Sequence, residues 1–238
     1  MTRGEEFQEL RPLLFAIAYR ILGSVAEAED AVQETWLRYE SSPTQPTSTK
    51  AFLSAVVTRI SIDVLRSARV RRETYVEPWF PEPLLTDPYE DPARSAELAD
   101  SLSMAARFFD ALRNGDVDQL RELLAADVSM VGDGGGKAPA LPKSVIGADN
   151  VARVLASNFP VLARIEASME QRELNGQPGA IIRDRDGNVV GTMMLDVIGG
   201  QIQTIRSVAN PDKLGHVGPV ADAWAIAREV KQARRPSD

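Results

Sequence analysis

Tyr75-Val76-Glu77-Pro78-Trp79-Phe80-Pro81-Glu82-Pro83-Leu84 separates two parts of this 238-residue chain that differ in their sequence patterns. Proline fixes the backbone angle φ and donates no amide hydrogen, so this stretch is neither a helix interior nor a central strand. A purely flexible linker would not carry a Trp, a Phe and a Tyr, whose rings gain from burial. Two interpretations remain open: a linker docked on a partner surface, and an ordered loop on one domain's own core.

Negative charge is concentrated around this linker. Residues 1–72 hold ten Lys or Arg against nine Asp or Glu, residues 73–100 hold one against eight, and residues 101–238 hold sixteen against seventeen. Between Arg59 and Arg72, five arginines stand against the single Asp63. A basic helix end before an acidic tether is typical of a DNA contact, and a solvated helix face is the open alternative.

Composition excludes several classes of protein. The chain has no cysteine and one histidine, so disulfides, thiolate chemistry and a typical structural zinc site are excluded, and we expect no metal or cofactor. No run of about 18 apolar residues suggests a membrane span. The acidic start at Glu5 and Glu6 is unlike a signal peptide. We therefore expect a cytoplasmic protein.

The first 72 residues predict three helices. Apolar residues recur at helical spacing from Phe7 to Ile21, and Gly23 ends that pattern as a C-cap would. Ser24 with Glu27 predicts a capping box for the second helix. A polar, proline-broken loop over Ser41–Thr49 precedes a third helix from about Lys50 to Arg72. This part of the chain contains no catalytic constellation.

From about residue 101 the pattern changes to mixed helices and strands. Asp186-Gly187-Asn188 and Gly199-Gly200 predict hairpin turns. Helices followed by an antiparallel meander predict an α+β cone, in which a curved sheet wraps helices. The expected helices are Ala106–Asn114, Val117–Ala126, Asn150–Phe159 and an exposed tail helix at Ala221–Arg235; the expected strands are Ser129–Val131, Arg164–Leu174, Ala180–Asp184, Val189–Asp196 and Gln201–Val208.

Several motifs resemble one known family. Ala28–Arg38 (AEDAVQETWLR) resembles the polymerase-binding stretch of sigma-70 region 2. Ala51-Phe52-Leu53 with Asp63–Ser67 (DVLRS) resembles the promoter-melting helix of extracytoplasmic-function (ECF) sigma factors. The Trp-Phe-Pro-Glu-Pro linker, Asp133–Lys137 (DGGGK) and Asn210–Leu214 (NPDKL) are together similar to an ECF subgroup with a C-terminal SnoaL-like domain. These motifs occur in the family's order and span nearly the whole chain.

The resemblance implies four segments, and it implies that one domain is missing. They are region 2 at 1–72, a linker and seam at 73–105, a SnoaL-like (nuclear transport factor 2-like) α+β cone at 106–214, and a tail helix at 215–238. ECF factors place region 4, a helix-turn-helix domain, after the linker. Asp91–Ala105 has room for one helix, so we expect region 4 to be deleted or left out at a seam near Ser101–Ala105. Arg59 and Phe52 also depart from the family, which often has Asn and Trp there.

The resemblance also implies a transcription factor whose C-terminal domain regulates it in cis. Its partners would be RNA polymerase core and promoter DNA, with no membrane. The polymerase-binding residues would be Asp30, Gln33, Glu34, Trp36 and Arg38. The DNA-binding residues would be Thr44, Thr47, Lys50, Phe52, Arg59, Arg66, Arg69, Arg71 and Arg72. The contact between linker and cone would involve Trp79, Phe80, Pro81, Asp133, Lys137, Asn210, Asp212 and Lys213. The alternatives of a solvated face for the charged residues and a core position for Phe52 remain open.

A second hypothesis is an isomerase- or cyclase-type enzyme, or a small-ligand binder, that uses the cone. Such cones have a deep apolar pocket, and a buried carboxyl group there could act as a base. The candidates are Asp133, Asp196 and His216. Asp133 in a glycine-rich turn also has a purely conformational explanation, and His216 between glycines predicts an exposed side chain. We therefore expect no enzymatic activity, and a ligand in the cone pocket stays an open question.

Overall fold

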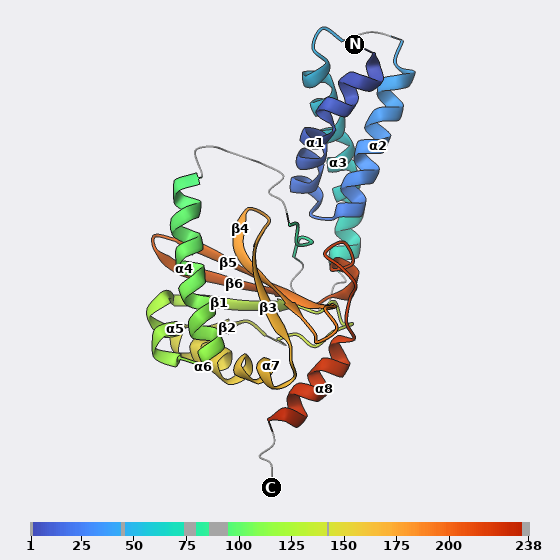
Figure 1. Cartoon of the computed structure of the whole chain (residues 1–238). Coiled ribbons are helices and arrows are strands. Elements are labelled where there is room, and N and C mark those ends of the chain that lie inside the picture. Colours follow the sequence, from blue (N-terminus) through green and yellow to red (C-terminus); the bar gives the residue numbers. More distant parts are fainter. Residues whose placement is uncertain (1, 44–45, 74–79, 86–94, 142, 235–238) are drawn as a thin grey trace. The chain divides into compact units, whose positions relative to one another are not determined.

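A computed structural model describes residues 2–43, 46–73, 80–85, 95–141 and 143–234, with the backbone alone at 68–73 and 95–98. The chain forms two compact units (Figure 1). The first contains the three N-terminal helices together with Phe80–Glu82, and the second contains Pro83–Leu85 and everything from residue 95 onward. Each unit is described below by itself.

The helical unit consists of α1 (Arg3–Leu22), α2 (Val25–Ser41) and α3 (Thr49–Glu73). Thr2 caps α1 in a capping box with Glu5, and Gly23 ends it in the left-handed region at φ 65°. Ser24 accepts a hydrogen bond from the Glu27 amide at the start of α2, as predicted. Leucine, valine and tyrosine side chains from all three helices fill the core. Those wholly or almost wholly buried include Leu14, Leu22, Val32, Tyr39, Leu53 and Val57.

The second unit is an α+β cone. Its helices are α4 (Ser95–Asn114), α5 (Val117–Leu123), α6 (Ala148–Asn158) and α7 (Pro160–Arg164), and its strands are β1 (Leu124–Asp133), β2 (Val145–Ile146), β3 (Ser168–Leu174), β4 (Gln177–Arg183), β5 (Val189–Ile198) and β6 (Gln201–Val208). The strand order is β2-β1-β6-β5-β4-β3. Strands β3 to β6 form the predicted antiparallel meander, whereas β1 lies parallel to β6. Helices α4 to α7 lie on one side of the curved sheet (Figure 1).

The two faces of this sheet have different neighbours. Alternate strand residues such as Ala180, Met193 and Leu195 belong to the core shared with α4, α5 and α6. Side chains alternate along a strand, so Asp196 lies on the opposite face. After β6 the chain passes through a 3-10 helix, η2 (Pro211–Lys213), and returns along β5, where Val189 exchanges backbone hydrogen bonds with Pro219 and Ala221. The chain then forms α8 (Ala223–Ala233).

Several predicted boundaries were wrong. Val117–Ala126 is a helix only to Leu123, and the strand predicted at Ser129–Val131 is ten residues long. The strand predicted from Arg164 begins only at Ser168, because Pro160 starts the short helix α7. The seam expected at Ser101–Ala105 lies inside α4, a helix that continues to the buried Phe108 and Phe109. The second compact unit includes α4 from Ser95 and the described residues after Leu214. Among the described residues, no helix has the length and apolarity needed to cross a membrane.

Candidate functional site

The outer side of α2 carries the predicted polymerase-binding residues. Ala28, Ala31, Val32, Thr35 and Tyr39 face the core. Helical spacing therefore turns Asp30, Gln33 and Arg38 to solvent, with Glu34 half-buried. Arg38 donates to Glu34 over 2.8 Å, and the intervening Leu37 is 51% exposed. The result is a mixed-charge stripe with one exposed leucine on a rigid helix, which suits contact with another helix.

A groove of about 390 Å³ lies beside this stripe, between α1 and α2. Phe7, Val32 and Trp36 supply its apolar surface, and the Trp36 ring lies 5.0 Å from that of Phe7. The other lining residues are Gly4, Gln8, Arg11, Glu29 and Gln33. Trp36 and Gln33 were predicted as site residues, but the α1 side was missed. Gly4 was an available signal, because a glycine in the first turn of a helix leaves space beside it.

The predicted DNA-binding residues are partly described. Thr47, Lys50, Arg59 and Arg66 are exposed, and Arg66 lies 3.9 Å from Asp63. Phe52 is half-buried, with its ring 6.2 Å from that of Tyr39, so it packs at least in part on the helical core. Thr44 and the side chains of Arg69, Arg71 and Arg72 lie outside the described residues.

Linker residue Glu82 is bound to the turn between α1 and α2. Its amide donates to the Gly23 carbonyl over 2.9 Å, and its carboxylate accepts from the Val25 amide over 3.0 Å. The Tyr19 hydroxyl donates to the Glu82 carbonyl. The Glu82 carboxylate thus satisfies an amide in the first turn of α2, where a helix leaves its N–H groups unpaired.

Linker residues Pro83 and Leu84 are bound to the cone. The Leu84 backbone amide donates to the side-chain oxygen Oδ1 of Asn175 over 2.7 Å. The backbone amide of Asn175 donates to the Leu84 carbonyl over 2.9 Å. His216 Nε2 donates to the Pro83 carbonyl, and Leu84 is 8% exposed. The prediction placed this contact at Trp79, Phe80 and Pro81. Trp79 lies outside the described residues, and Phe80 and Pro81 fall within the helical unit, so their contact with the cone stays a prediction.

The sequence did not reveal the two cone residues that bind the linker, Asn175 and His216. Asn175 and Gly176 have φ of 54° and 72°, as the two central residues of a type I′ hairpin turn require. This turn points the Asn175 amide and side chain at the linker. The Asn-Gly dipeptide was a readable turn signal, but nothing in it indicated a linker. His216 is exposed, as predicted, and its ring still makes this contact.

The glycine-rich motif and the Asn-Pro-Asp-Lys-Leu motif are paired to each other. Asp133 is wholly buried and accepts from Lys213 over 2.7 Å, while Lys137 donates to Asp212 over 2.6 Å at the surface. The Asp133 carbonyl also accepts from the Ala209 and Asn210 amides. The parallel pairing of β1 with β6 brings the two motifs together, since Asp133 lies opposite Val208. These side chains were also predicted as partners of the acidic linker. The contacts above join the two motifs to each other, and the linker contact stays a prediction.

The three candidate bases do not form a proton-abstraction site. Asp133 is held by Lys213, Asp196 pairs with Arg206 over 2.6 Å, and His216 is exposed. A cavity of about 250 Å³ lies on the helix side of the sheet, at the ends of β1 and β6. Of the described residues that line it, Asp133 alone is titratable, and the Asp133 carboxylate is paired with Lys213.

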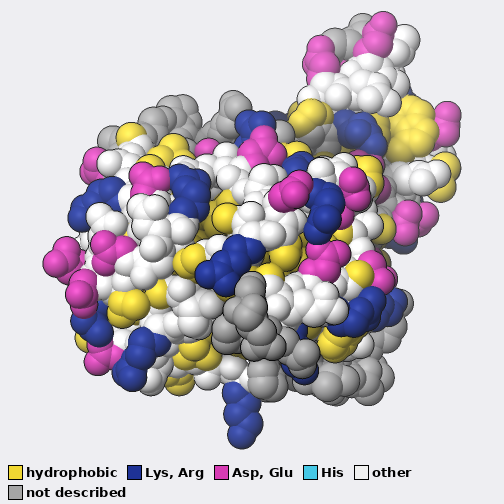
Figure 2. Space-filling model, turned by 60° about the horizontal axis from the view of Figure 1, so that its bottom comes forward, with side chains coloured by type: hydrophobic (Ala, Val, Ile, Leu, Met, Phe, Trp, Pro, Cys, Tyr) yellow, Lys and Arg dark blue, Asp and Glu magenta, His cyan; other side chains and the backbone are white. Residues whose placement is uncertain are grey.

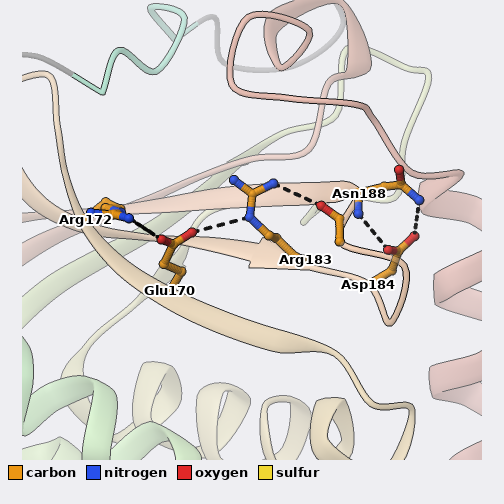
Figure 3. Close-up of polar contacts among 6 residues, drawn as sticks. Glu170, Arg172, Arg183, Asp184 and Asn188 are labelled. Atoms are coloured by element: carbon orange, nitrogen blue, oxygen red, sulfur yellow. Dashed lines mark hydrogen bonds and ion pairs between the residues drawn. The ribbon is translucent and has the colours of Figure 1, made fainter.

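A polar network fixes the hairpins on the face of the sheet away from the helices (Figure 3). Hydrogen bonds from Arg172, with a further contribution from Arg183, lower the pKa of Glu170 despite partial burial. Burial acts to raise the pKa of Asp184, but hydrogen bonds from Asn188 and the Asp186 amide outweigh it, and the pKa is lowered. Elsewhere on the surface basic and acidic side chains are interspersed (Figure 2). These groups stabilise turns rather than a reaction centre.

Comparison with known proteins supports the division into two units. The family model of sigma-70 region 2 matches residues 7–71. The ECF RNA polymerase sigma factor SigJ of Mycobacterium tuberculosis is 36% identical over 213 residues, which are 87% of this chain and 62% of that protein. This chain thus spans less than two thirds of that relative's length.

One solved structure matches the fold over nearly the whole chain. The crystal structure of M. tuberculosis SigJ matches 92% of this chain and 100% of the chain in that structure, with a TM-score of 0.68 and 26% identity in the structural alignment. A putative ketosteroid isomerase from Kribbella flavida covers 47% of this chain and 78% of its own, with a TM-score of 0.34 and 15% identity.

Proposed function

This chain belongs to the ECF sigma factors of the SigJ type, and on that premise we propose that it binds RNA polymerase core and directs it to the minus-ten element of promoters. The observation that carries the proposal is the stripe Asp30–Arg38 within the region 2 match. Its charges face solvent and are not used to stabilise the helical core. The protein would work in the cytoplasm, where polymerase and promoters are found.

The stripe on α2 is suited to a helical partner. It combines both signs of charge with the exposed Leu37, and the adjoining groove adds an apolar surface at Trp36. Interfaces of this kind gain affinity from an aromatic anchor surrounded by a polar rim. We therefore assign polymerase binding to Asp30, Gln33, Glu34, Trp36 and Arg38.

DNA binding would follow from α3 and the loop before it. Lys50, Arg59 and Arg66 are exposed cations that could neutralise phosphates, and Thr47 could hydrogen-bond an unstacked base. Thr44, Arg69, Arg71 and Arg72 remain proposals from the sequence. Nine residues separate Leu85 from α4, and a helix-turn-helix domain needs several helices. We infer that region 4 is absent at this point, so recognition would rest on the minus-ten element.

The C-terminal cone would regulate the helical unit in cis. Glu82 is bound in the helical unit, and the next two residues are bound in the cone. A linker whose successive residues are bound in this way can transmit a conformational change of the cone to region 2. We propose that these linker contacts control when the helical unit binds polymerase.

Charge reversal tests the polymerase face. Glu34 and Arg38 bond to each other one helical turn apart, so the double variant Glu34→Lys, Arg38→Glu keeps an ion pair while inverting the surface. We expect it to abolish pull-down of RNA polymerase core by the full chain, with an unchanged helical circular dichroism spectrum.

A matched control reverses another exposed pair. Asp110→Arg with Arg113→Asp inverts a pair of the same type on α4 of the cone and should bind core as the wild type does. Wild-type binding by the α2 double variant would rule out this face and, with it, the proposed mode of polymerase binding.

A small-ligand function for the cone is the second candidate. The observation that favours it is the cavity of about 250 Å³ between the sheet and α6. Its surface holds no reactive constellation, so binding rather than catalysis is the activity that it supports.

A further inference from the structure

The C-terminal helix α8 is held on the cone by half-buried apolar side chains such as Ile226 and Val230, by an ion pair between Glu229 and Arg185, and by polar contacts at its two ends. All residues of α8 are described, and none of them is fully buried. At its start, Trp224 Nε1 donates to the Lys137 carbonyl over 2.8 Å. At its end, Arg164 donates to the Ala233 carbonyl over 3.0 Å, and Arg234 donates to the Asn158 side-chain oxygen. Because none of its side chains is fully buried, α8 should detach at a lower free-energy cost than the core helices of the cone.

These contacts reach two walls of the same cavity. Lys137 lies just before Pro139–Leu141, which form one wall, and Asn158 belongs to the opposite wall on α6. A helix of 11 residues is about 16 Å long, enough to connect the two sites. In Figure 1, α8 lies beside α7, which follows α6. Release of α8 would therefore change both walls of the cavity.

The cavity accepts a particular class of ligand. Met130, Leu141, Val154 and Phe159 give it an apolar surface, while Asn158 and Ser207 add neutral polar groups. The Asp133 carboxylate also lines the cavity, and its charge is paired with Lys213. At about 250 Å³ it is smaller than the pockets that hold drug-sized molecules. A small, neutral and mainly apolar molecule with one hydrogen-bond donor matches these properties.

We propose that such a ligand binds in this cavity and competes with Arg234 for Asn158, so that binding releases α8. Asn158 already donates from its amide nitrogen to the Val154 carbonyl over 2.5 Å, which fixes the side chain. Its oxygen, which accepts from Arg234, can instead accept from a ligand donor. Binding and attachment of α8 are then mutually opposed, as linkage requires. This inference goes beyond transcription initiation and does not depend on it.

Indole tests the proposal, because it is neutral and bicyclic and carries one N–H donor. By calorimetry, the full chain should bind indole saturably and bind benzofuran, which has the same shape without the N–H, more weakly. Arg234→Ala should tighten indole binding about three- to tenfold, because one competing hydrogen bond is removed. Lys231→Ala removes an exposed cation from the same helix and should leave the affinity unchanged.

Two further measurements complete the test. Ala140→Phe, which fills the cavity from its loop wall, should abolish binding. Saturating indole should accelerate amide hydrogen exchange in α8 of the wild type. If neither the wild type nor Arg234→Ala binds indole saturably, the ligand site is refuted. If both bind with equal affinity and exchange in α8 does not change, the competition is refuted. Pull-down of polymerase core is a separate measurement and decides neither outcome.

Discussion

The two units use the polar residues of their sequence motifs in opposite ways. In the helical unit, the charges of the Asp30–Arg38 stripe point to solvent and pair weakly with each other. In the cone, Asp133 and Lys213 are buried and paired with each other across 80 positions of sequence. Motif residues in one unit are thus available to a partner, whereas those in the other hold the fold together. A motif shared with a family can therefore mark an internal contact as readily as a binding surface.

Removing the buried cation Lys213 should have the largest effect on stability. Lys213→Met leaves the Asp133 carboxylate buried without its counter-charge, and loss of one partner from a buried pair costs about 3–5 kcal/mol. Urea unfolding of the full chain should show this loss in the transition of the cone. The comparison variant Lys137→Met removes an exposed lysine, and it should lower the free energy of unfolding by less than about 1 kcal/mol. Equal costs for the two variants would contradict the internal role of the motif.

Two neighbouring glycines in the turn after Asp133 should differ in their tolerance of alanine. Gly135 and Gly136 both have positive φ, 61° and 69°, so alanine is strained at either position. A Cβ on Gly135 would lie 2.4 Å from the Asn210 side-chain nitrogen, whereas one on Gly136 would meet nothing within 4 Å. We expect Gly136→Ala to cost about 1 kcal/mol and Gly135→Ala about 1–2 kcal/mol more. Thermal unfolding would show the difference as a lower Tm, and identical Tm values would mean that the two motifs do not touch here.

The helical unit was more predictable from sequence than the cone. Its helices follow from local signals, such as Gly23 as a C-cap and Ser24 as an N-cap, which act within a few residues. In the cone, Gln201–Val208 was predicted with its observed bounds, but the parallel pairing of β1 with β6 was not, because it joins residues about 75 positions apart. The linker-binding residues Asn175 and His216 were missed for the same reason. Their role depends on where the fold brings Pro83 and Leu84, and no local pattern encodes that.

Weakening the contact between the linker and the cone should have an intermediate effect. Asn175→Gly keeps the positive φ but removes the oxygen that accepts from the Leu84 amide, at a cost of about 1–2 kcal/mol. Limited proteolysis at residues 73–94 should become faster, and transcription in vitro from a minus-ten-dependent promoter should change. Gly187→Ala is a control in another hairpin turn of the cone, where an added Cβ would meet none of the described residues within 4 Å. Cleavage and transcription that both match the wild type would show that this contact does not regulate region 2.

The smallest effect concerns charges on the outer surface of the cone. The pKa of Glu170 is lowered, first by hydrogen bonds from Arg172 and then by Arg183, so the folded state favours the ionised carboxylate. A lowered folded-state pKa gives stability that is present above the ordinary value of 4.5 and is lost as the pH falls through the folded-state pKa. Since Glu170 is more than one third exposed, solvent should reduce the contribution to well under about 1 kcal/mol. Glu170→Gln should therefore lower the urea midpoint slightly at pH 7, and the difference from the wild type should become smaller as the pH falls below 4.5. A difference between variant and wild type that grows towards acid would contradict the assignment of these arginines as its partners.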